Sequence, residues 1–151
     1  MSAGLIVYRD TCGAIEVLLV HPGGPLWARR DAGAWSIPKG EYLQGEDAAE
    51  RAEQEFAEEL GSPAPAGPRI ELGQVRQAGG KLVHAWAVRG DVDASTAHSN
   101  EFDMEWPRGS GVVRSFPEVD RAAWFSLPEA RTKLVAGQVP LLERLAASLG
   151  M

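Results

Sequence analysis

The sequence predicts an α/β fold in which a mixed β-sheet lies between helices. Three observations support this: two pairs of short apolar runs, each joined by turn residues, an amphipathic helix pattern between the pairs, and helical spacing of leucines near the C-terminal end. Strands, a helix, further strands and final helices in this order are typical of an α/β sandwich. With 151 residues, the chain suits one domain, which we expect to span residues 1–151.

The first two strands are predicted at residues 3–8 and 15–21, where apolar side chains dominate. Polar residues and a glycine fill positions 9–14 between them, which indicates a hairpin. Residues 21–35 are rich in Gly, Pro and Arg and are expected to form an irregular connection.

The clearest helix is predicted over residues 47–60, because Gly61 and Pro63 follow it as stop signals. Residues 70–77 and 81–89 indicate a second hairpin that turns at 78–80.

The polar segment 91–111 is expected to be an irregular lid or substrate-facing loop. A last strand is predicted at 122–126, followed by one or two helices over 127–149 whose leucines pack into the core.

Composition excludes several classes of function. Fifteen Lys and Arg against 21 Asp and Glu give a formal net charge of −6, which argues against a polynucleotide partner. A small anionic substrate stays compatible with this charge if a metal ion supplies positive charge locally. No apolar run approaches the roughly 20 residues of a membrane span. The single cysteine, Cys12, cannot form an intramolecular disulfide, so a reducing, cytoplasmic location is expected.

The prediction of a chemical function depends on three acidic residues of the predicted helix. Residues three and four apart share a helix face, so Glu55, Glu58 and Glu59 project from one side within about a turn. Their mutual repulsion, and that of the negative helix C-terminus, calls for compensation. A hard cation such as Mg²⁺ or Mn²⁺ prefers carboxylate oxygens and would supply it. The alternative is a solvated acidic face, which is the usual meaning of an isolated E-x-x-E-E pattern.

The surrounding spacing resembles the Nudix box, G-x5-E-x7-R-E-U-x-E-E-x-G-U, in which U is a bulky apolar residue. The positions in register are Gly40, Glu46, Glu55, Phe56, Glu58, Glu59 and Gly61. Gln54 replaces the arginine of the pattern, and Ser62 replaces its last apolar residue. Residues 35–40 are similar to the W-x-x-P-K-G approach of Nudix enzymes that hydrolyse dinucleoside polyphosphates and diphosphoinositol phosphates.

The resemblance implies an α/β/α sandwich that hydrolyses a nucleoside diphosphate linked to another group, with Mg²⁺ or Mn²⁺ as cofactor. The metal ligands it implies are the carboxylates of Glu55, Glu58 and Glu59 and the backbone carbonyl of Gly40. These three glutamates are also the catalytic candidates, because a carboxylate such as Glu58 could alternatively act as general base.

Three further residues are expected to orient these glutamates. In the family, Glu46 commonly pairs with the box arginine, an ion pair that Gln54 cannot make. Arg51 lies four residues before Glu55 and could supply the missing charge, or it could be a solvated helix residue.

Substrate contacts are expected mainly outside the helix. Lys39 is the best candidate for a phosphate contact, and Arg29 and Lys81 are weaker ones. Glu105 and Glu118 are candidates for a further carboxylate at the site. Trp27, like other tryptophans of the chain, could stack on a base, although core packing is the commoner role.

The sequence therefore predicts Mg²⁺-dependent hydrolysis of a pyrophosphate bond, with a (di)nucleoside polyphosphate as the favoured substrate class. The alternatives are a Nudix-fold binding or regulatory module that lost catalysis through Gln54, and an acidic helix that meets a basic protein partner. The expected partner is a small nucleotide or pyrophosphate, with no polynucleotide and no membrane, and a homodimer stays open.

Overall fold

The computed structural model describes residues 1–151 and contains one main sheet of six strands. Its strands are β1 (Ser2–Thr11), β2 (Ala14–Pro22), β3 (Lys39–Glu41), β4 (Ile70–Arg76), β5 (Leu82–Arg89) and β8 (Val119–Ser126). The order is β4-β5-β1-β2-β8, and β3 pairs with one end of β1. β1 and β5 run parallel, whereas the other pairs are antiparallel. The predicted mixed sheet is confirmed.

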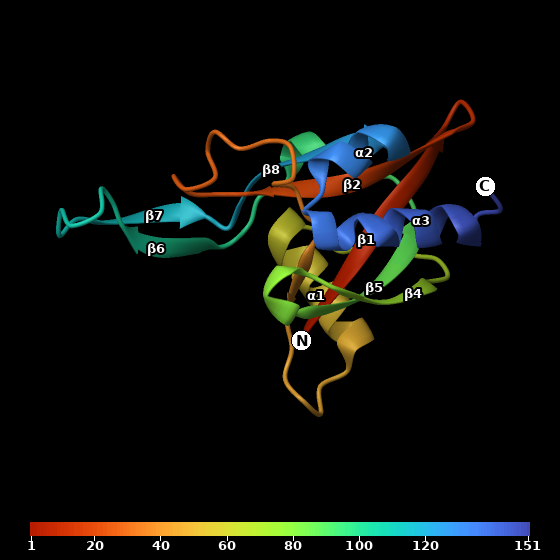
Figure 1. Cartoon of the computed structure of the whole chain (residues 1–151), viewed down its shortest axis with the longest axis horizontal. Helices are drawn as coiled ribbons and strands as arrows, with labels where there is room; N and C mark the ends of the chain where they lie inside the picture. The colour runs from red at the N-terminus through yellow and green to blue at the C-terminus, as the bar shows by residue number, and fades with distance from the viewer.

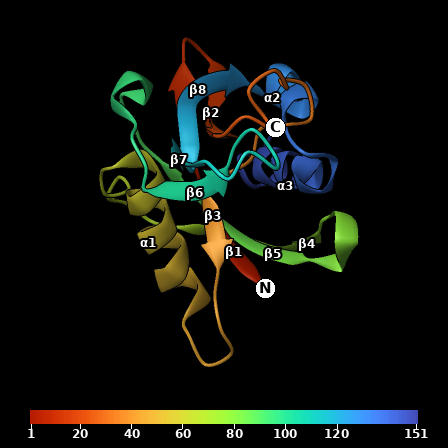
Figure 2. The same ribbon diagram turned by 90° about the vertical axis from the view of Figure 1, so that its left-hand side faces the viewer.

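Helices cover both faces of this sheet. The helix α1 (Ala48–Leu60) lies on one side, and α2 (Leu127–Lys133) and α3 (Val139–Ser148) lie on the other (Figure 2). β1 is central, so its alternate side chains enter two cores: Leu5 and Val7 pack on the α1 side, and Ile6 and Tyr8 on the other. The α/β/α sandwich is confirmed. None of the helices is long and apolar enough to span a membrane.

The catalytic-helix candidate α1 begins one residue later than predicted, because Asp47 serves as its N-cap. The Asp47 carboxylate accepts hydrogen bonds from the backbone N–H groups of Ala49 and Glu50. Phe56 is fully buried and Leu60 nearly so. This apolar side anchors α1 on the sheet and leaves the glutamates on its remaining surface.

The prediction of an irregular segment at 91–111 is wrong at residues 101–105, which form a strand. β6 (Glu101–Glu105) pairs antiparallel with β7 (Val113–Pro117) in a separate two-stranded ribbon. This ribbon projects from the body of the molecule as an arm (Figure 1). Phe102 and Met104 are half-buried, whereas the three acidic residues between and beside them are exposed. The last strand, β8, also begins earlier than predicted, at Val119.

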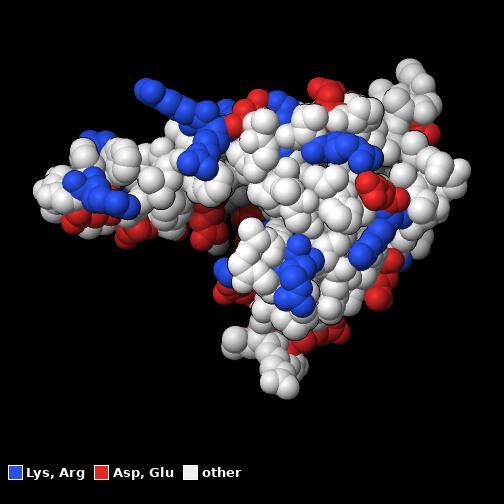
Figure 3. Space-filling model, in the orientation of Figure 1, with Lys and Arg blue, Asp and Glu red and all other residues white.

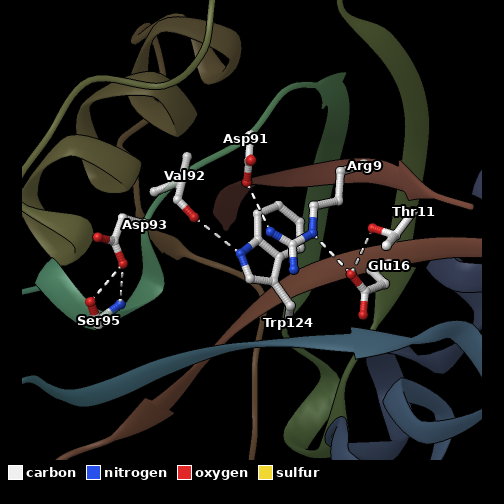
Figure 4. Close-up of polar contacts among 8 residues, drawn as sticks. All are labelled: Arg9, Thr11, Glu16, Asp91, Val92, Asp93, Ser95 and Trp124. Atoms are coloured by element: carbon white, nitrogen blue, oxygen red, sulfur yellow. Dashed lines mark hydrogen bonds and ion pairs between the residues drawn. The ribbon is translucent and has the colours of Figure 1, made fainter.

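A cluster around Arg9 fixes the segment that leads from the sheet to this ribbon (Figure 4). The Arg9 guanidinium lies 4.0 Å from the centre of the Trp124 ring and pairs with Glu16 and Asp91, each at 2.9 Å. The Trp124 indole N–H in turn donates to the carbonyl of Val92 at 3.0 Å. The first residues after β5 are thereby bound to β1, β2 and β8.

Candidate metal and pyrophosphate site

The strand β3 and the helix α1 bring the predicted ligands together. The backbone N–H of Lys39 donates to Glu59 Oε2 at 3.1 Å. A Cβ atom on residue 40 would lie only 2.0 Å from Glu55 Cδ, so the Glu55 carboxylate rests directly against the Gly40 backbone. Any larger residue at position 40 would displace this carboxylate. Steric contact with Glu55 therefore explains why position 40, the first glycine of the box pattern, has no side chain here.

The two carboxylates that face β3 are poorly solvated. Glu55 is only 8% exposed, and this burial raises the pKa of its carboxyl. The positive charge of Arg51 acts against this rise, and the negative charges of Glu58 and Glu118 add to it. Burial raises the pKa of Glu59 to about 8, and the charges of Glu55 and Glu118 add to the shift. The Lys39 backbone N–H and side chain act in the opposite direction. Negative charge at this site is therefore incompletely balanced by the protein itself.

Arg51 is an ion-pair partner within the site and not a free surface residue. Its Nη2 lies 2.6 Å from Glu55 Oε1, its Nη1 donates to Gln54 Oε1 at 3.1 Å, and its Nε donates to the carbonyl of Glu41 at 3.2 Å. Arg51 thus contacts three groups together: the backbone at the end of β3, the Gln54 side chain and the carboxylate of Glu55, a candidate metal ligand. Its guanidinium reaches Glu55 from one turn earlier on α1 than the arginine of the box pattern.

No hydrogen bond joins Glu46 to Gln54. Glu46 Oε1 accepts from the backbone N–H of Leu43 at 2.7 Å and so stabilises the turn before α1. The Gln54 amide oxygen accepts from Arg51. The pair of residues that the family pattern would join is therefore replaced here by two local interactions.

Glu58 is exposed on the same helix, and its charge acts on Glu55. Lys81 also lies near the site, because its Nζ is 3.5 Å from Glu41 Oε1 at the end of β3. Arg29 is exposed on the connection between β2 and β3 and makes no ion pair.

The structure distinguishes the two loop carboxylates suggested by the sequence. Glu118 directly follows β7, and its charge raises the pKa of both Glu55 and Glu59. Glu105 pairs with Val113 at the opposite end of the ribbon, about 13 Å along the strand at about 3.3 Å per residue. There its carboxylate accepts from the Gly109 backbone N–H at 2.6 Å. Glu105 therefore lies at the far end of the ribbon, whereas Glu118 is close enough for its charge to act on Glu55 and Glu59.

The donor chemistry of these residues fits a hard divalent cation. Carboxylate oxygens and a backbone carbonyl are the ligands that Mg²⁺ prefers, and Figure 3 shows acidic side chains gathered in the hollow where the ribbon meets the body. Glu55 is held by Arg51 in this structure, and no three His, Cys, Asp or Glu side chains already converge on one point. The fit therefore rests on the kind and charge of the donors, and water or substrate oxygens would complete the coordination.

The fold and this acidic helix define an α/β/α protein whose clustered carboxylates are of the donor type that a hard cation prefers. A family model described as the NUDIX domain matches residues 1–145. The chain therefore belongs to the Nudix family, and this membership supports a pyrophosphohydrolase.

Solved structures share the fold at low sequence identity. The C. elegans Ap4A hydrolase, in a binary complex, is 24% identical with a TM-score of 0.63, and the match covers 99% of this chain and 98% of that one. The NUDIX domain of Shewanella oneidensis NrtR, complexed with ADP ribose, is 14% identical with a TM-score of 0.63 over 98% and 86% of the two chains. A Nudix hydrolase from M. Smegmatis, RenU, is 22% identical with a TM-score of 0.56 over 99% and 84%.

Proposed function

We propose that the protein hydrolyses a pyrophosphate bond in a nucleoside diphosphate-linked compound, with Mg²⁺ or Mn²⁺ as cofactor. The observation that carries this proposal is the pair of poorly solvated carboxylates, Glu55 and Glu59, which contact the backbone of β3. Such a cluster costs free energy unless a cation or protons neutralise it. Pyrophosphate chemistry requires a cation at the same place.

Each residue has a distinct part in this proposal. Glu55, Glu58, Glu59 and the Gly40 carbonyl would hold the metal, which supplies charge neutralisation of the phosphates and lowers the pKa of a bound water. The Lys39 side chain, next to the Gly40 backbone, would contact a phosphate oxygen.

The remaining groups position and accept protons. Arg51 would fix the orientation of the Glu55 carboxylate through its short ion pair. Glu118, or alternatively Glu58 if it is not a metal ligand, would accept the proton of the attacking water. In-line attack at phosphorus then needs little beyond positioning and charge stabilisation.

The favoured substrate class is a (di)nucleoside polyphosphate. The approach at residues 35–40 supports this class, as does the fold shared with an Ap4A hydrolase and with a domain complexed with ADP ribose. The net charge of −6 supports a small-molecule substrate over a polynucleotide. Cytoplasmic location stays a prediction, and the oligomeric state stays open.

The test is a substrate panel of a dinucleoside tetraphosphate, ADP-ribose and a nucleoside triphosphate, each incubated with Mg²⁺ and analysed for products. We expect hydrolysis of the dinucleoside polyphosphate to fall about 100-fold or more in Glu58→Gln. Glu50→Gln, the same change on an exposed residue of the first turn of α1, should leave the rate unchanged. Tight nucleotide binding without hydrolysis of any substrate would overturn the proposal in favour of the binding-module alternative.

A further inference from the structure

The buried side chain of Gln138 joins segments that are far apart in the chain. Gln138 is the last residue of a short 3-10 helix, η3 (Ala136–Gln138), which connects α2 to α3. These helices lie on the face of the sheet opposite to α1 (Figure 2). Gln138 is also the N-cap residue of α3, but its side chain makes no capping hydrogen bond to that helix. The amide is fully buried, and all of its hydrogen bonds go to other segments.

The hydrogen bonds of this amide have one consistent direction. A backbone N–H can only donate, so the amide oxygen must face Ile37, and Gln138 Oε1 accepts from the Ile37 N–H at 2.9 Å. The Nε2 group then donates to Gln77 Oε1 at 2.6 Å and to Ser36 Oγ at 3.0 Å. The Ser36 hydroxyl itself donates to the Ile37 carbonyl at 2.7 Å, which leaves its oxygen able to accept. The oxygen and both hydrogens of the Gln138 amide are thus engaged.

The backbone of Ile37 depends on Gln138 for its hydrogen bond. Ile37 is fully buried, and the acceptor for its N–H is the Gln138 side chain. The residues on either side are bound to the sheet instead: Ser36 pairs with β2, and the Leu5 N–H donates to the Pro38 carbonyl at 3.1 Å. A buried N–H without an acceptor is costly, so loss of the Gln138 amide would favour a shift of this segment.

A shift of Ile37 would be transmitted directly to the carboxylate site. Only Pro38 separates Ile37 from Lys39, the first residue of β3, and the ring of a proline fixes its backbone φ angle. The Lys39 N–H donates to Glu59, and the backbone of the next residue lies against Glu55. The position of β3 relative to the two glutamates of α1 therefore depends on the segment that Gln138 holds.

The contact with Gln77 fixes the position of Gln138 itself. The backbone of Gly137 lies directly against Gln77, because a Cβ atom at position 137 would lie 2.6 Å from Gln77 Cα. Gln77 is rigidly placed in turn, since its N–H donates to the Lys81 carbonyl at 2.8 Å and closes the β4–β5 hairpin. The helix η3 therefore packs on the end of this hairpin and presents the Gln138 amide to Ile37 from a fixed place.

We propose that Gln138 is a positioning residue for the proposed cation site: it holds residues 36–38 so that the Gly40 carbonyl and the Glu55 and Glu59 carboxylates act on a cation together. The inference rests on the function proposed above and deepens it, because it adds a residue that touches neither the metal nor the substrate. Linkage supplies a test in the unaltered protein. A cation that binds better when the bond between Ile37 and Gln138 is intact must also stabilise that bond.

The first experiment measures amide hydrogen exchange of the wild-type protein by NMR, with and without Mg²⁺. We expect saturating Mg²⁺ to slow exchange of the Ile37 N–H about tenfold. The reference is the Gly33 N–H, which donates to the Thr132 carbonyl of α2 at 3.0 Å and should change little. An Ile37 N–H that Mg²⁺ does not protect would overturn the inference, even if no variant of Gln138 folds.

The second experiment compares two substitutions in the same part of the core. Gln138→Met keeps the length of the side chain and removes its amide, whereas Leu141→Val loosens the core cluster that also contains Ile37. Both variants should unfold at a lower urea concentration than the wild type. Only Gln138→Met should bind Mn²⁺ more weakly, by about tenfold, as expected when a residue that orients metal ligands is lost. Equal Mn²⁺ affinity in the two variants would mean that Gln138 is only structural and would overturn the inference.

The outcomes separate this inference from the proposed function. Weaker Mn²⁺ binding by Gln138→Met alone, with no hydrolysis of any substrate by the wild type, would support the positioning role and overturn the hydrolase. Hydrolysis of a nucleotide at equal rates by the wild type and Gln138→Met, with equal Mn²⁺ affinity, would overturn the positioning role and retain the hydrolase.

Discussion

The side chain of Glu59 shows how one residue links the site's charge to the stability of the fold. In the unfolded chain its carboxyl has the ordinary pKa of 4.5, and in the folded protein burial raises this pKa to about 8. Between these values the folded protein retains a proton that the unfolded chain has lost. The stabilising contribution is therefore complete below the unfolded pKa and is lost as the pH rises through the folded pKa.

We predict that the free energy of unfolding of the metal-free protein decreases from about pH 5 to about pH 8 in a manner that depends on Glu59. In Glu59→Gln, which cannot ionise, this part of the decrease should be absent. Urea unfolding at several pH values in the presence of a chelator measures it. Glu50→Gln should behave as the wild type, and an equally steep decrease in Glu59→Gln would show that its carboxyl is not desolvated.

Arg51 is the second residue whose role can be tested alone. Because it pairs with Glu55 at 2.6 Å and with Gln54, we predict that Arg51→Ala lowers kcat/KM and Mn²⁺ affinity by about 10- to 100-fold. Adding Gln54→Arg to this variant should recover part of the loss, since it restores a cation next to Glu55 in the chain.

The control is Arg69→Ala, which removes a cation that lies just before β4 and pairs with Glu53 of α1. Arg69 contacts Glu53 through two hydrogen bonds at 2.9 and 2.7 Å and does not reach the site glutamates. Kinetics and Mn²⁺ binding that respond equally to both single substitutions would refute a specific role for Arg51.

At the scale of elements, α1 carries the proposed metal ligands, and the role of its N-cap can be tested separately from theirs. Asp47 accepts from two backbone N–H groups at 2.9 and 3.2 Å. We predict that Asp47→Ala destabilises the protein by about 1 kcal/mol while changing kcat little. Thermal or urea unfolding measures the change in stability. A large loss of activity in a protein of unchanged stability would mean that Asp47 takes part in the reaction and not only in the helix.

The elements that could be predicted from sequence are those whose signals are local. The first hairpin, α1 and the second hairpin follow from apolar runs, turn residues and stop signals, and the structure differs from these predictions by a few residues at their ends. The shared helix face of Glu55 and Glu59 likewise follows from their spacing. The placement of Gly40 beside them was expected only from the resemblance to the Nudix box, because no strand was predicted where β3 lies.

The ribbon β6–β7 was missed because acidic residues dominate the segment and suggested a solvated loop. A signal was nevertheless present: Phe102 and Met104 alternate with acidic residues from Glu101 to Glu105, which is the period of a strand with one covered face. That the charge of Glu118 acts on Glu55 and Glu59, whereas Glu105 lies at the far end of the ribbon, could not be predicted from sequence, because it depends on which end of the ribbon returns to the sheet.

At the scale of the whole molecule, the sandwich assembles the site from segments far apart in the chain. The sheet places β3 beside β1 and α1, and the end of β7 returns Glu118 to the same corner. The same molecule carries a net charge of −6, which repels an anionic polyphosphate at long range. The proposed cation would reduce both kinds of repulsion, because it would neutralise the glutamates and attract an anionic substrate.

The central claim is that Glu55 and Glu59 jointly bind a divalent cation. The direct test is a titration of the protein with Mn²⁺ at neutral pH and above. The concentration of free Mn²⁺ is measured by electron paramagnetic resonance. The account predicts a saturable site in the wild type and in Glu50→Gln, and at least about tenfold weaker binding in Glu55→Gln and in Glu59→Gln. Equal Mn²⁺ binding by all four proteins, or no saturable binding by the wild type, would contradict it.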